Sequence, residues 1–356
     1  MTFDAPAVDV AARTEILELG DQRWAGFVAR HPGATPFHLP AWGRAVADCY
    51  GFRAFALASL DGGDRVTAGV PVVEVRRPLG RRRWVSLPFT DHCPPLLAEG
   101  ASAPALVRAL RAELDDAGVG RLQIRAGVEG AAQDAVAVRH LLPLAADPEA
   151  VRRRFHASQV QRNIRRAERE GVTVRMGAER TDLTEVFFGL HVRTRQRQGV
   201  PVQPRRFFDL IWDHVLAAGH GQVLVAEHAG VPVAAAVFLR HNGTVVYKFG
   251  ASDASAWKLR PNHALFWTAI RTACESGDRA FDWGRTDYEN TGLRAFKSEW
   301  GADELPLVHS TVGDAPAAEA APLGESRAAR KLAKVIQRSP EWVCTGLGRA
   351  LYRYTA

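Results

Sequence analysis

The sequence lacks long apolar runs, paired cysteines and a leader-like start. No stretch approaches the roughly 18 consecutive apolar residues that a membrane-spanning helix needs. The four cysteines (Cys49, Cys93, Cys274 and Cys344) form no CxxC pair, so neither a zinc site nor a disulfide framework is indicated. The first residues carry acidic side chains and no basic start followed by an apolar run, so no signal peptide is visible and we expect a cytoplasmic protein.

Most short catalytic motifs are missing as well. The chain contains no GxSxG, no HExxH, no Walker lysine loop, no GxGxxG after a strand and no HxxxD. These absences argue against a serine hydrolase, a zinc protease, an NTPase, a dehydrogenase and a condensing acyltransferase. A site built from loops at strand ends remains.

Lysine is also scarce. Only five of the 46 Lys and Arg residues are lysines, and none precedes Lys248. The formal net charge of +7 favours anionic partners such as tRNA, nucleotide diphosphates or acidic membranes without selecting one. Because arginine supplies positive charge elsewhere, a retained lysine indicates a need for a compact ammonium. Lys297 is therefore a candidate functional residue.

Lys297 lies in the most polar segment that follows an apolar strand. The strand 280–283 breaks at Gly284, passes through a loop rich in Asp, Asn and Thr, and leads into a helical pattern that carries Phe296 and Lys297. Such a density of polar groups after a core strand is typical of a site. The alternative is a solvated lysine on a surface helix.

The pattern of elements predicts an α/β protein with mixed sheets and two similar domains in tandem. A strand at 66–75, a helix at 103–117 and a strand at 121–125 have counterparts at 231–237, 262–276 and 280–283. We expect an N-terminal domain at 1–150, a second domain with the site at 151–312, and a linker with a basic helical tail at 313–356.

The connection between the two domains, residues 148–171, is basic and helical. Arg162, Arg166 and Arg169 are spaced to share one helix face. This face is either a ridge for phosphate groups or a solvated surface balanced by neighbouring glutamates. In the tail, an apolar stripe of Leu332, Val335 and Ile336 favours docking on the protein itself over contact with lipid or RNA.

An ordered set of motifs resembles the Fem-type (FemABX-like) branch of the GNAT superfamily. The set is SQVQRNIRRAEREGV at 158–172, HVRTRQRQGVPVQP at 191–204, YKFGASD at 247–253, LRPN at 259–262, FDWGRT at 281–286 and GLRAFKSEWG at 292–301. TPFHLPAW at 35–42 and PFTDHCPP at 88–95 are similar but less specific. The resemblance spans nearly the whole chain.

This resemblance implies two GNAT-like domains that move an aminoacyl group from aminoacyl-tRNA onto an amine. The acceptor would be a peptidoglycan precursor or a natural product, with peripheral membrane proximity if the acceptor is lipid-linked. No metal and no bound cofactor are expected. An acyl-CoA or acyl-carrier-protein N-acyltransferase is the alternative, although residues 257–262 lack the glycines that bind CoA pyrophosphate in GNAT loops. A non-catalytic RNA binder is a third interpretation.

The resemblance also assigns roles. Lys297 would stabilise the oxyanion of the tetrahedral intermediate, with Phe296 stacking nearby. Tyr247 would position the attacking amine, or is simply a strand aromatic. Asp282 and Arg285 would orient substrate, or pair with each other to brace the loop.

Further residues are expected to contact substrate. Asp91 is a candidate for binding a substrate ammonium, while a thiol acyl-enzyme at Cys93 is disfavoured because no acid partner is apparent. Arg162, Arg166, Lys258 and Arg260 are candidates for phosphate groups, and Asn262 and Trp42 complete the expected substrate contacts.

Overall fold

The computed structural model describes residues 13–76, 82–314 and 327–352. The chain divides into two compact units. Unit 1 contains Phe52–Asp134 and the described parts of Met1–Ala47 and Val308–Ala315; unit 2 contains Asp48–Gly51, Ala135–Leu307 and the described part of Pro316–Ala356.

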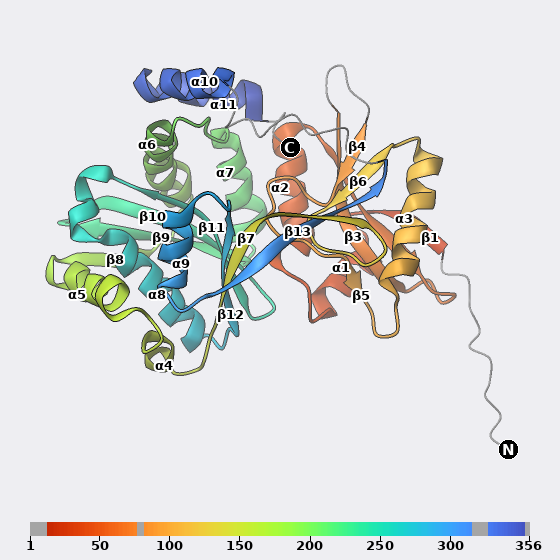
Figure 1. Cartoon of the computed structure of the whole chain (residues 1–356), viewed down its shortest axis with the longest axis horizontal. Coiled ribbons are helices and arrows are strands. Elements are labelled where there is room, and N and C mark those ends of the chain that lie inside the picture. The colour runs from red at the N-terminus through yellow and green to blue at the C-terminus, as the bar shows by residue number, and fades with distance from the viewer. Residues whose placement is uncertain (1–12, 77–81, 315–326, 353–356) are drawn as a thin grey trace. The chain divides into compact units, whose positions relative to one another are not determined.

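Unit 1 is built on a mixed sheet with the strand order β1-β2-β3-β4-β6-β13 (Figure 1). Neighbouring strands are antiparallel except β4 and β6, which are parallel. The parallel pair is joined through helix α3, as such a crossover requires. The bounds are β1 Arg13–Glu18, β2 Arg53–Leu60, β3 Val66–Val75, β4 Arg83–Val85, β6 Arg121–Ile124 and β13 Asp303–Gly313, with β5 (Leu96–Leu97) paired to β3.

Helices cover both faces of this sheet. Alternate residues of β2 point to opposite faces, so Phe55 and Leu57 join the core under α3 while Ala56 and Ala58 join the core under α1. The helices are α1 Gln22–Arg30, α2 Pro40–Tyr50 and α3 Ala103–Ala117.

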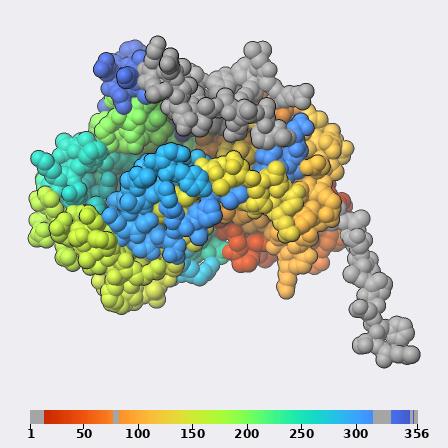
Figure 2. Space-filling view, viewed as in Figure 1, coloured from red at the N-terminus to blue at the C-terminus, as the bar shows by residue number. Residues whose placement is uncertain are grey.

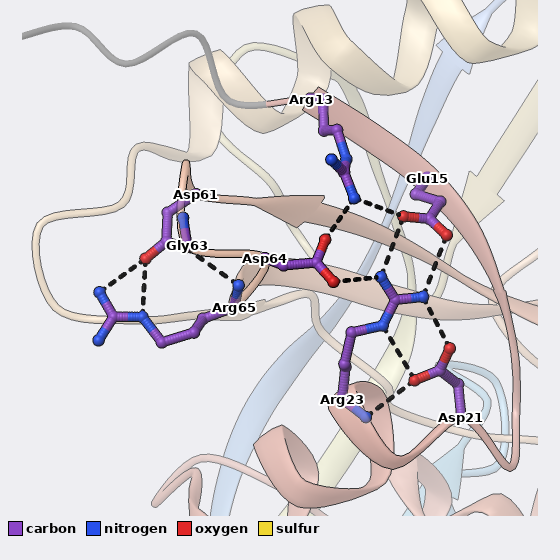
Figure 3. A network of polar contacts seen from close by, with 8 residues as sticks. All are labelled: Arg13, Glu15, Asp21, Arg23, Asp61, Gly63, Asp64 and Arg65. Carbon is purple, nitrogen blue, oxygen red and sulfur yellow. Dashed lines mark hydrogen bonds and ion pairs between the residues drawn. The ribbon is translucent and has the colours of Figure 1, made fainter.

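An ion network fixes one edge of unit 1 (Figure 3). The Arg23 guanidinium contacts the carboxylates of Glu15 on β1, Asp21 at the start of α1 and Asp64 in the β2–β3 turn, at 3.0, 2.8 and 3.1 Å. Arg13 contacts Glu15 and Asp64 as well. The network therefore ties the β2–β3 turn to β1 and to the start of α1, which precede it by about 40 residues or more.

Unit 2 repeats the plan, with the strand order β8-β9-β10-β11-β12-β7 (Figure 1). Its strands are antiparallel except β11 and β12, which are parallel and joined through α8. The bounds are β7 Ala132–Pro143, β8 Val172–Met176, β9 Gly221–His228, β10 Val231–His241, β11 Thr244–Ser252 and β12 Ala280–Thr286.

The unit 2 sheet is also covered on both faces. Leu224, Ala226 and Phe238 share a core with α5 and α8, while the alternate face, with Val223 and Val225, lies toward α6 and the turn before it. The helices are α4 Pro148–Arg152, α5 Arg162–Arg169, α6 Phe188–Gln198, α7 Arg205–Ile211, α8 Pro261–Glu275 and α9 Thr291–Ser298.

Two C-terminal helices, α10 (Arg327–Arg338) and α11 (Glu341–Leu351), pack beside α6. Ile336 and Cys344 are buried in a cluster with Val192 and Val202. The expected docking of the apolar stripe is thus seen for Ile336, whereas Val335 is 54% exposed. Among the described residues, no helix has both the length and the apolar character needed to cross a membrane.

The expected α/β class with mixed sheets is confirmed, and each sheet is completed by a strand from elsewhere in the chain. Residues of β13, which follow unit 2 in sequence, pair with β6 and close the sheet of unit 1. Residues of β7, which follow β6 in sequence, pair with β12 and close the sheet of unit 2. The two units have therefore exchanged their last strands.

Candidate active site

The candidate site lies where β11 and β12 part in unit 2. These parallel strands pair only from Thr244↔Ala280 to Val246↔Asp282. Beyond that point β11 continues along β10, while β12 bulges between Asp282 and Arg285 and continues along β7. Gly284 in the bulge has φ +68°, a left-handed conformation that glycine adopts without strain. The end of β12 consequently presents backbone carbonyls beyond the last residue that pairs with β11.

Lys297 occupies this position. Its Nζ donates to the carbonyl oxygens of Trp283, Gly284 and Arg285 at 2.7, 3.1 and 3.1 Å. The residue is only 2% exposed, although α9 lies on the surface of unit 2 (Figure 2). Lys297 is thus a buried cation whose N–H donors meet the bulge, and the alternative of a solvated surface lysine is wrong.

The geometry explains why this position is a lysine in an arginine-rich chain. An ammonium carries three donors arranged around one nitrogen, which suits three carbonyls that converge on one point. A guanidinium spreads its donors over a planar fork and does not match such an arrangement. Charge-assisted hydrogen bonds to all three carbonyls offset part of the cost of burying the charge.

Aromatic side chains surround the parted strands. Tyr247 on β11 lies 6.3 Å from Trp283 and 4.9 Å from Phe266, measured between ring centroids. Phe296 packs 6.2 Å from both Trp283 and Trp300. These rings exclude water from the backbone beside Lys297, which strengthens electrostatic interactions there.

Tyr247 is a neutral phenol in this setting. Burial raises the pKa of Tyr247 to about 12, so the hydroxyl does not act as a base at neutral pH. A Cβ atom added at Gly250 would collide with the Tyr247 hydroxyl, which therefore lies directly over that glycine. Tyr247 is suited to donate a hydrogen bond rather than to accept a proton.

His263, in the first turn of α8, is a neighbour that the sequence did not reveal. Its ring stacks on Trp300 at 5.8 Å and meets the edge of Phe296 at 5.7 Å. Burial lowers the pKa of His263 to about 4, with a smaller lowering from Arg260, against a hydrogen bond to the backbone of Gln159. The imidazole is neutral at physiological pH. A histidine two residues after Pro261, at a helix start, was the only signal in the sequence.

His140 on β7 is a second unforeseen neighbour. It is fully buried, with Nε2 3.2 Å from a carboxylate oxygen of Glu304. Burial and the positive charge of Lys297 lower the pKa of His140, while Glu304 opposes the shift.

Asp282 and Arg285 brace the bulge through separate partners. An Asp282 carboxylate oxygen accepts the backbone N–H of Gly284 at 2.8 Å, and the other oxygen lies 3.9 Å from Arg139. Arg285 pairs with Asp287 at 2.8 Å instead of with Asp282. Bracing of the loop is therefore observed, but not through the Asp282–Arg285 pair that the sequence suggested.

Comparison with known proteins relates part of the chain to a known family. Residues 152–298, which include both parted strands and Lys297, match the family model of the acetyltransferase (GNAT) domain. Residues 152–298 form a GNAT domain. No match was found among curated proteins.

Solved structures share the fold of the chain as a whole. FemX is 15% identical, with a TM-score of 0.66 over 84% of this chain and 97% of FemX. The C-terminal domain of a putative lysylphosphatidylglycerol synthetase from Agrobacterium fabrum is 16% identical, with a TM-score of 0.57 over 82% of this chain and 91% of that domain. L-PGS from Bacillus licheniformis is 15% identical, with a TM-score of 0.57 over 91% of this chain and 99% of that chain. The expected likeness to Fem-type proteins is confirmed as a likeness of fold.

The helix that joins the parted strands in the GNAT domain begins without glycine. Arg260 precedes α8 with φ +61°, a conformation that costs an arginine more than a glycine. Pro261 follows and has no N–H to offer a ligand. Lys258 and Arg260 are exposed and Asn262 is partly buried, so their side chains supply the polar groups at this helix start.

Arg162 and Arg166 lie on α5 of the GNAT domain, away from the parted strands in sequence. Arg162 is exposed, while Arg166 is partly buried and lies 3.6 Å from Glu170. The packing of α5 against α8 places both on the helical layer of unit 2. The solvated-helix interpretation and the phosphate-ridge interpretation both fit this placement.

The candidate residues in unit 1 have different surroundings. Trp42 is 1% exposed and its indole N–H donates to Thr90 Oγ1 at 3.0 Å, so Trp42 belongs to the core of unit 1. Asp91 is partly buried in the loop that follows β4. Cys93 is fully buried and burial raises the pKa of its thiol, which argues further against an acyl-enzyme.

A pocket of about 190 Å³ lies at the other end of the unit 2 sheet. Its lining includes Arg240 and Asp278, which pair with each other at 2.9 Å. It also includes Thr272 of α8 and Ser276, the residue that follows this helix. This pocket is at the end of α8 opposite to Lys297 and His263. The pocket is therefore separate from the candidate site at the parted strands.

Proposed function

We propose that the chain is an aminoacyltransferase that moves an aminoacyl group from aminoacyl-tRNA to an amine. The acceptor is an amine of a peptidoglycan precursor or of a natural product. The observation that carries the proposal is the Lys297 ammonium, held on three carbonyls where β11 and β12 part within a GNAT domain. The fold shared with FemX and L-PGS adds support.

The reaction joins the acceptor nitrogen to the carbonyl carbon of the donor ester. The neutral amine attacks, the carbonyl oxygen becomes an oxyanion, and the C–O bond to the tRNA ribose then breaks as the C–N bond is retained. The proton lost by the attacking nitrogen goes to the ribose oxygen that leaves. Negative charge therefore appears on the carbonyl oxygen only midway through the reaction.

Lys297 supplies a fixed positive charge that stabilises this oxyanion. A preorganised cation in a site with little water stabilises a developing oxyanion more than it stabilises the neutral ester. The ammonium acts through its charge, because its three donors are engaged by the carbonyls of Trp283, Gly284 and Arg285. Phe296 packs on Trp283, whose carbonyl accepts from the ammonium.

The remaining residues have supporting roles in this proposal. Tyr247 donates a hydrogen bond that orients the acceptor amine or the ester. Asp282 holds the backbone of the bulge in place through Gly284. Arg285 orients substrate, and Lys258, Arg260, Asn262, Arg162 and Arg166 contact phosphate and ribose groups of the donor.

The glycine-free start of α8 favours tRNA over CoA. A CoA pyrophosphate needs several backbone N–H groups in a small loop. Here Pro261 removes one such donor and the neighbouring charges are on long side chains. An acyl-CoA or acyl-carrier-protein N-acyltransferase is nevertheless the second candidate, because the matching family model describes an acetyltransferase.

A transfer assay separates the two candidates. The full-length chain is incubated with labelled amino acids, total tRNA, synthetases and a panel of amines, with and without ribonuclease. We expect label in a small amide product, formation that ribonuclease abolishes, and loss of formation with Lys297→Met. Parallel reactions contain labelled acyl-CoA or acyl-carrier protein and no tRNA. Product in those reactions, insensitive to ribonuclease, would overturn the proposal and establish the second candidate.

A further inference from the structure

An exposed tryptophan stands at the end of β11, on the connection to α8. Trp257 is 47% exposed, yet its position is fixed because its indole Nε1 donates to Ser252 Oγ at 3.0 Å. The guanidinium carbon of Arg197, from α6, lies 4.8 Å from the centroid of the ring. Arg197 in turn donates to the Ser252 carbonyl at 3.5 Å. A rigid aromatic ring therefore reaches solvent with a cation against it.

Packing alone does not account for this arrangement. Trp267 and Trp283 of the same domain are buried, at 5% and 1% exposure, and Trp212 is partly buried. A ring held by a hydrogen bond and a guanidinium loses little conformational freedom when a planar ligand stacks on it. Stacking of a nucleobase on such a ring contributes roughly 1–3 kcal/mol per base.

The surroundings of Trp257 are strongly cationic. Arg193 on α6 is exposed, and both Arg193 and Arg197 act on the Asp253 carboxylate at the end of β11. Lys258 follows directly and is exposed as well. Asp253 is the only acidic residue in α6 and in the β11–α8 connection, and Ser255 already engages it at 2.9 Å through its backbone N–H. The net charge around the ring suits phosphate groups.

The tryptophan and the candidate site are at the same end of the unit 2 sheet. The connection that carries Trp257 runs from the C-terminal end of β11 to Pro261 at the start of α8. His263, in the first turn of α8, contacts Phe296 on α9. A strand of nucleotides that passes over Trp257 thus approaches the first turn of α8, where His263 contacts Phe296, the neighbour of Lys297 in sequence.

We infer that Trp257 stacks on an unpaired nucleobase near the 3′ end of an RNA, with Arg193, Arg197 and Lys258 along the adjacent phosphates. The inference rests on the proposed function for the identity of the RNA, which is the single-stranded end of the aminoacyl donor. Stacking is tolerant of base identity and the cations follow the backbone, so the surface reads a single-stranded terminus and not a sequence.

Binding without turnover tests this surface. The ligand is an uncharged RNA hairpin with an unpaired 3′ end that contains 2-aminopurine, whose fluorescence falls on stacking. We expect the full-length protein to quench the signal, and Trp257→Ala to weaken binding about tenfold. Trp257→Phe retains most of the affinity because a ring remains. Trp342→Ala, at a tryptophan that is 74% exposed on α11, is the matched control and leaves binding unchanged.

The other arms separate alternative ligands. A blunt hairpin without the unpaired end, and CoA as a competitor, are measured under the same conditions. The inference would be overturned by any of three results. Trp257→Ala could bind the RNA as tightly as the unsubstituted protein does, or the blunt hairpin could bind as tightly as the hairpin with the unpaired end. The third such result is displacement of the RNA by comparable concentrations of CoA. Raising salt weakens binding, and Arg197→Met reduces the steepness of that dependence.

The outcome is distinct from that of the transfer assay. Quenching that depends on Trp257 without aminoacyl transfer would remove the proposed function and leave the RNA-binding surface in place. Aminoacyl transfer together with equal quenching by Trp257→Ala and by the unsubstituted protein would remove the RNA-binding surface and leave the proposed function in place. Thermal unfolding of each variant shows whether a lost signal reflects lost folding.

Discussion

The two units share one plan but treat the end of their parallel strands differently. In unit 1, β4 stops at Val85 and the following loop bonds back to β6: Ser86 N–H donates to the Gln123 carbonyl at 2.8 Å, and Arg125 N–H donates to Ser86 Oγ at 2.7 Å. Cys93 N–H also donates to the Arg125 carbonyl at 3.0 Å. Backbone and hydroxyl groups thus close the place where, in unit 2, the strands part.

In unit 2 a charged side chain takes the place of that loop. The Lys297 ammonium satisfies three carbonyls of β12 without covering them with a second strand. The same topology is therefore closed by neutral groups in one copy and held open by a cation in the other. The comparison teaches that two units with the same plan differ at this point by one buried lysine, Lys297 of unit 2.

The largest expected effect comes from removing that cation. Lys297→Met should lower the aminoacyl transfer rate by about two to three powers of ten, because the oxyanion loses its fixed positive charge. Lys297→Arg should lose most of the activity too, since a planar fork does not fit three convergent carbonyls. Single-turnover rates, with circular dichroism as a check on folding, provide the measurement.

Ser86→Ala in unit 1 is the matched control. It leaves the Arg125 N–H without its hydroxyl partner, which should cost about 1–2 kcal/mol of unfolding free energy and leave the rate of the folded protein unchanged. Equal loss of rate in Ser86→Ala and Lys297→Met would contradict the contrast between the two units.

Low pH should lower the stability of unit 2 because two of its histidines are buried. Burial lowers the pKa of both His191 and His263 to about 4, from an ordinary value near 6.5. Between these values the unfolded state binds more protons than the folded state, so stability falls as pH drops from about 6.5 toward 4. Each group contributes up to about 3 kcal/mol. Denaturant titrations across this window should show the fall, and His191→Gln should flatten it.

Two closely packed glycines, one in each unit, allow the packing of the two units to be compared. Gly250→Ala in unit 2 should destabilise by about 1–3 kcal/mol, because the new methyl group meets the Tyr247 hydroxyl. Gly69→Ala in unit 1 meets the Leu57 carbonyl at 2.7 Å and should cost a similar amount. Adding Tyr247→Phe should restore part of the stability lost in Gly250→Ala and none of that lost in Gly69→Ala, as read from urea unfolding midpoints. The rescue is partial because the ring carbon Cζ still lies 2.9 Å from the added atom. Failure of that rescue would mean that the Tyr247 hydroxyl does not lie over Gly250.

The smallest expected effect concerns the ion network of unit 1 (Figure 3). Hydrogen bonds from Arg23 lower the pKa of Glu15 and of Asp21, so their contribution is present at neutral pH and is lost as pH falls below about 4. Because the groups are at the surface, Arg23→Ala should lower the melting temperature only slightly. High salt should shrink that difference, and a salt-independent loss would point to packing instead.

Local features of the fold were predictable from the sequence. Helix α3 begins after Ser102, which caps it, and ends at Gly118 in a left-handed conformation, as the pattern of residues predicts. The hydrophobic periodicity of the sequence and the order of its elements predict the mixed sheets and the repeat of strand, helix and strand. The exchange of β7 and β13 was not predictable, because strand partners far apart in sequence leave no local trace.

The candidate site was predictable only in part. The scarcity of lysine singled out Lys297, but its partners are backbone carbonyls, which no sequence displays. The imidazoles of His140 and His263 became apparent only through burial, since neither belongs to a motif. Asp282 and Arg285 were expected to orient substrate or to pair with each other, and the structure gives each of them a different partner.

The strand exchange also has a consequence for how the chain is made. Unit 1 cannot pair the outer edge of β6 until β13 has left the ribosome, which requires synthesis of all of Ala135–Leu307 first. During translation the first half of the nascent chain thus carries one unsatisfied sheet edge, the kind of edge that invites aggregation. A premature stop anywhere before Val308 would deprive the N-terminal half of its closing strand, even when the stop falls after every helix of the GNAT domain has been made.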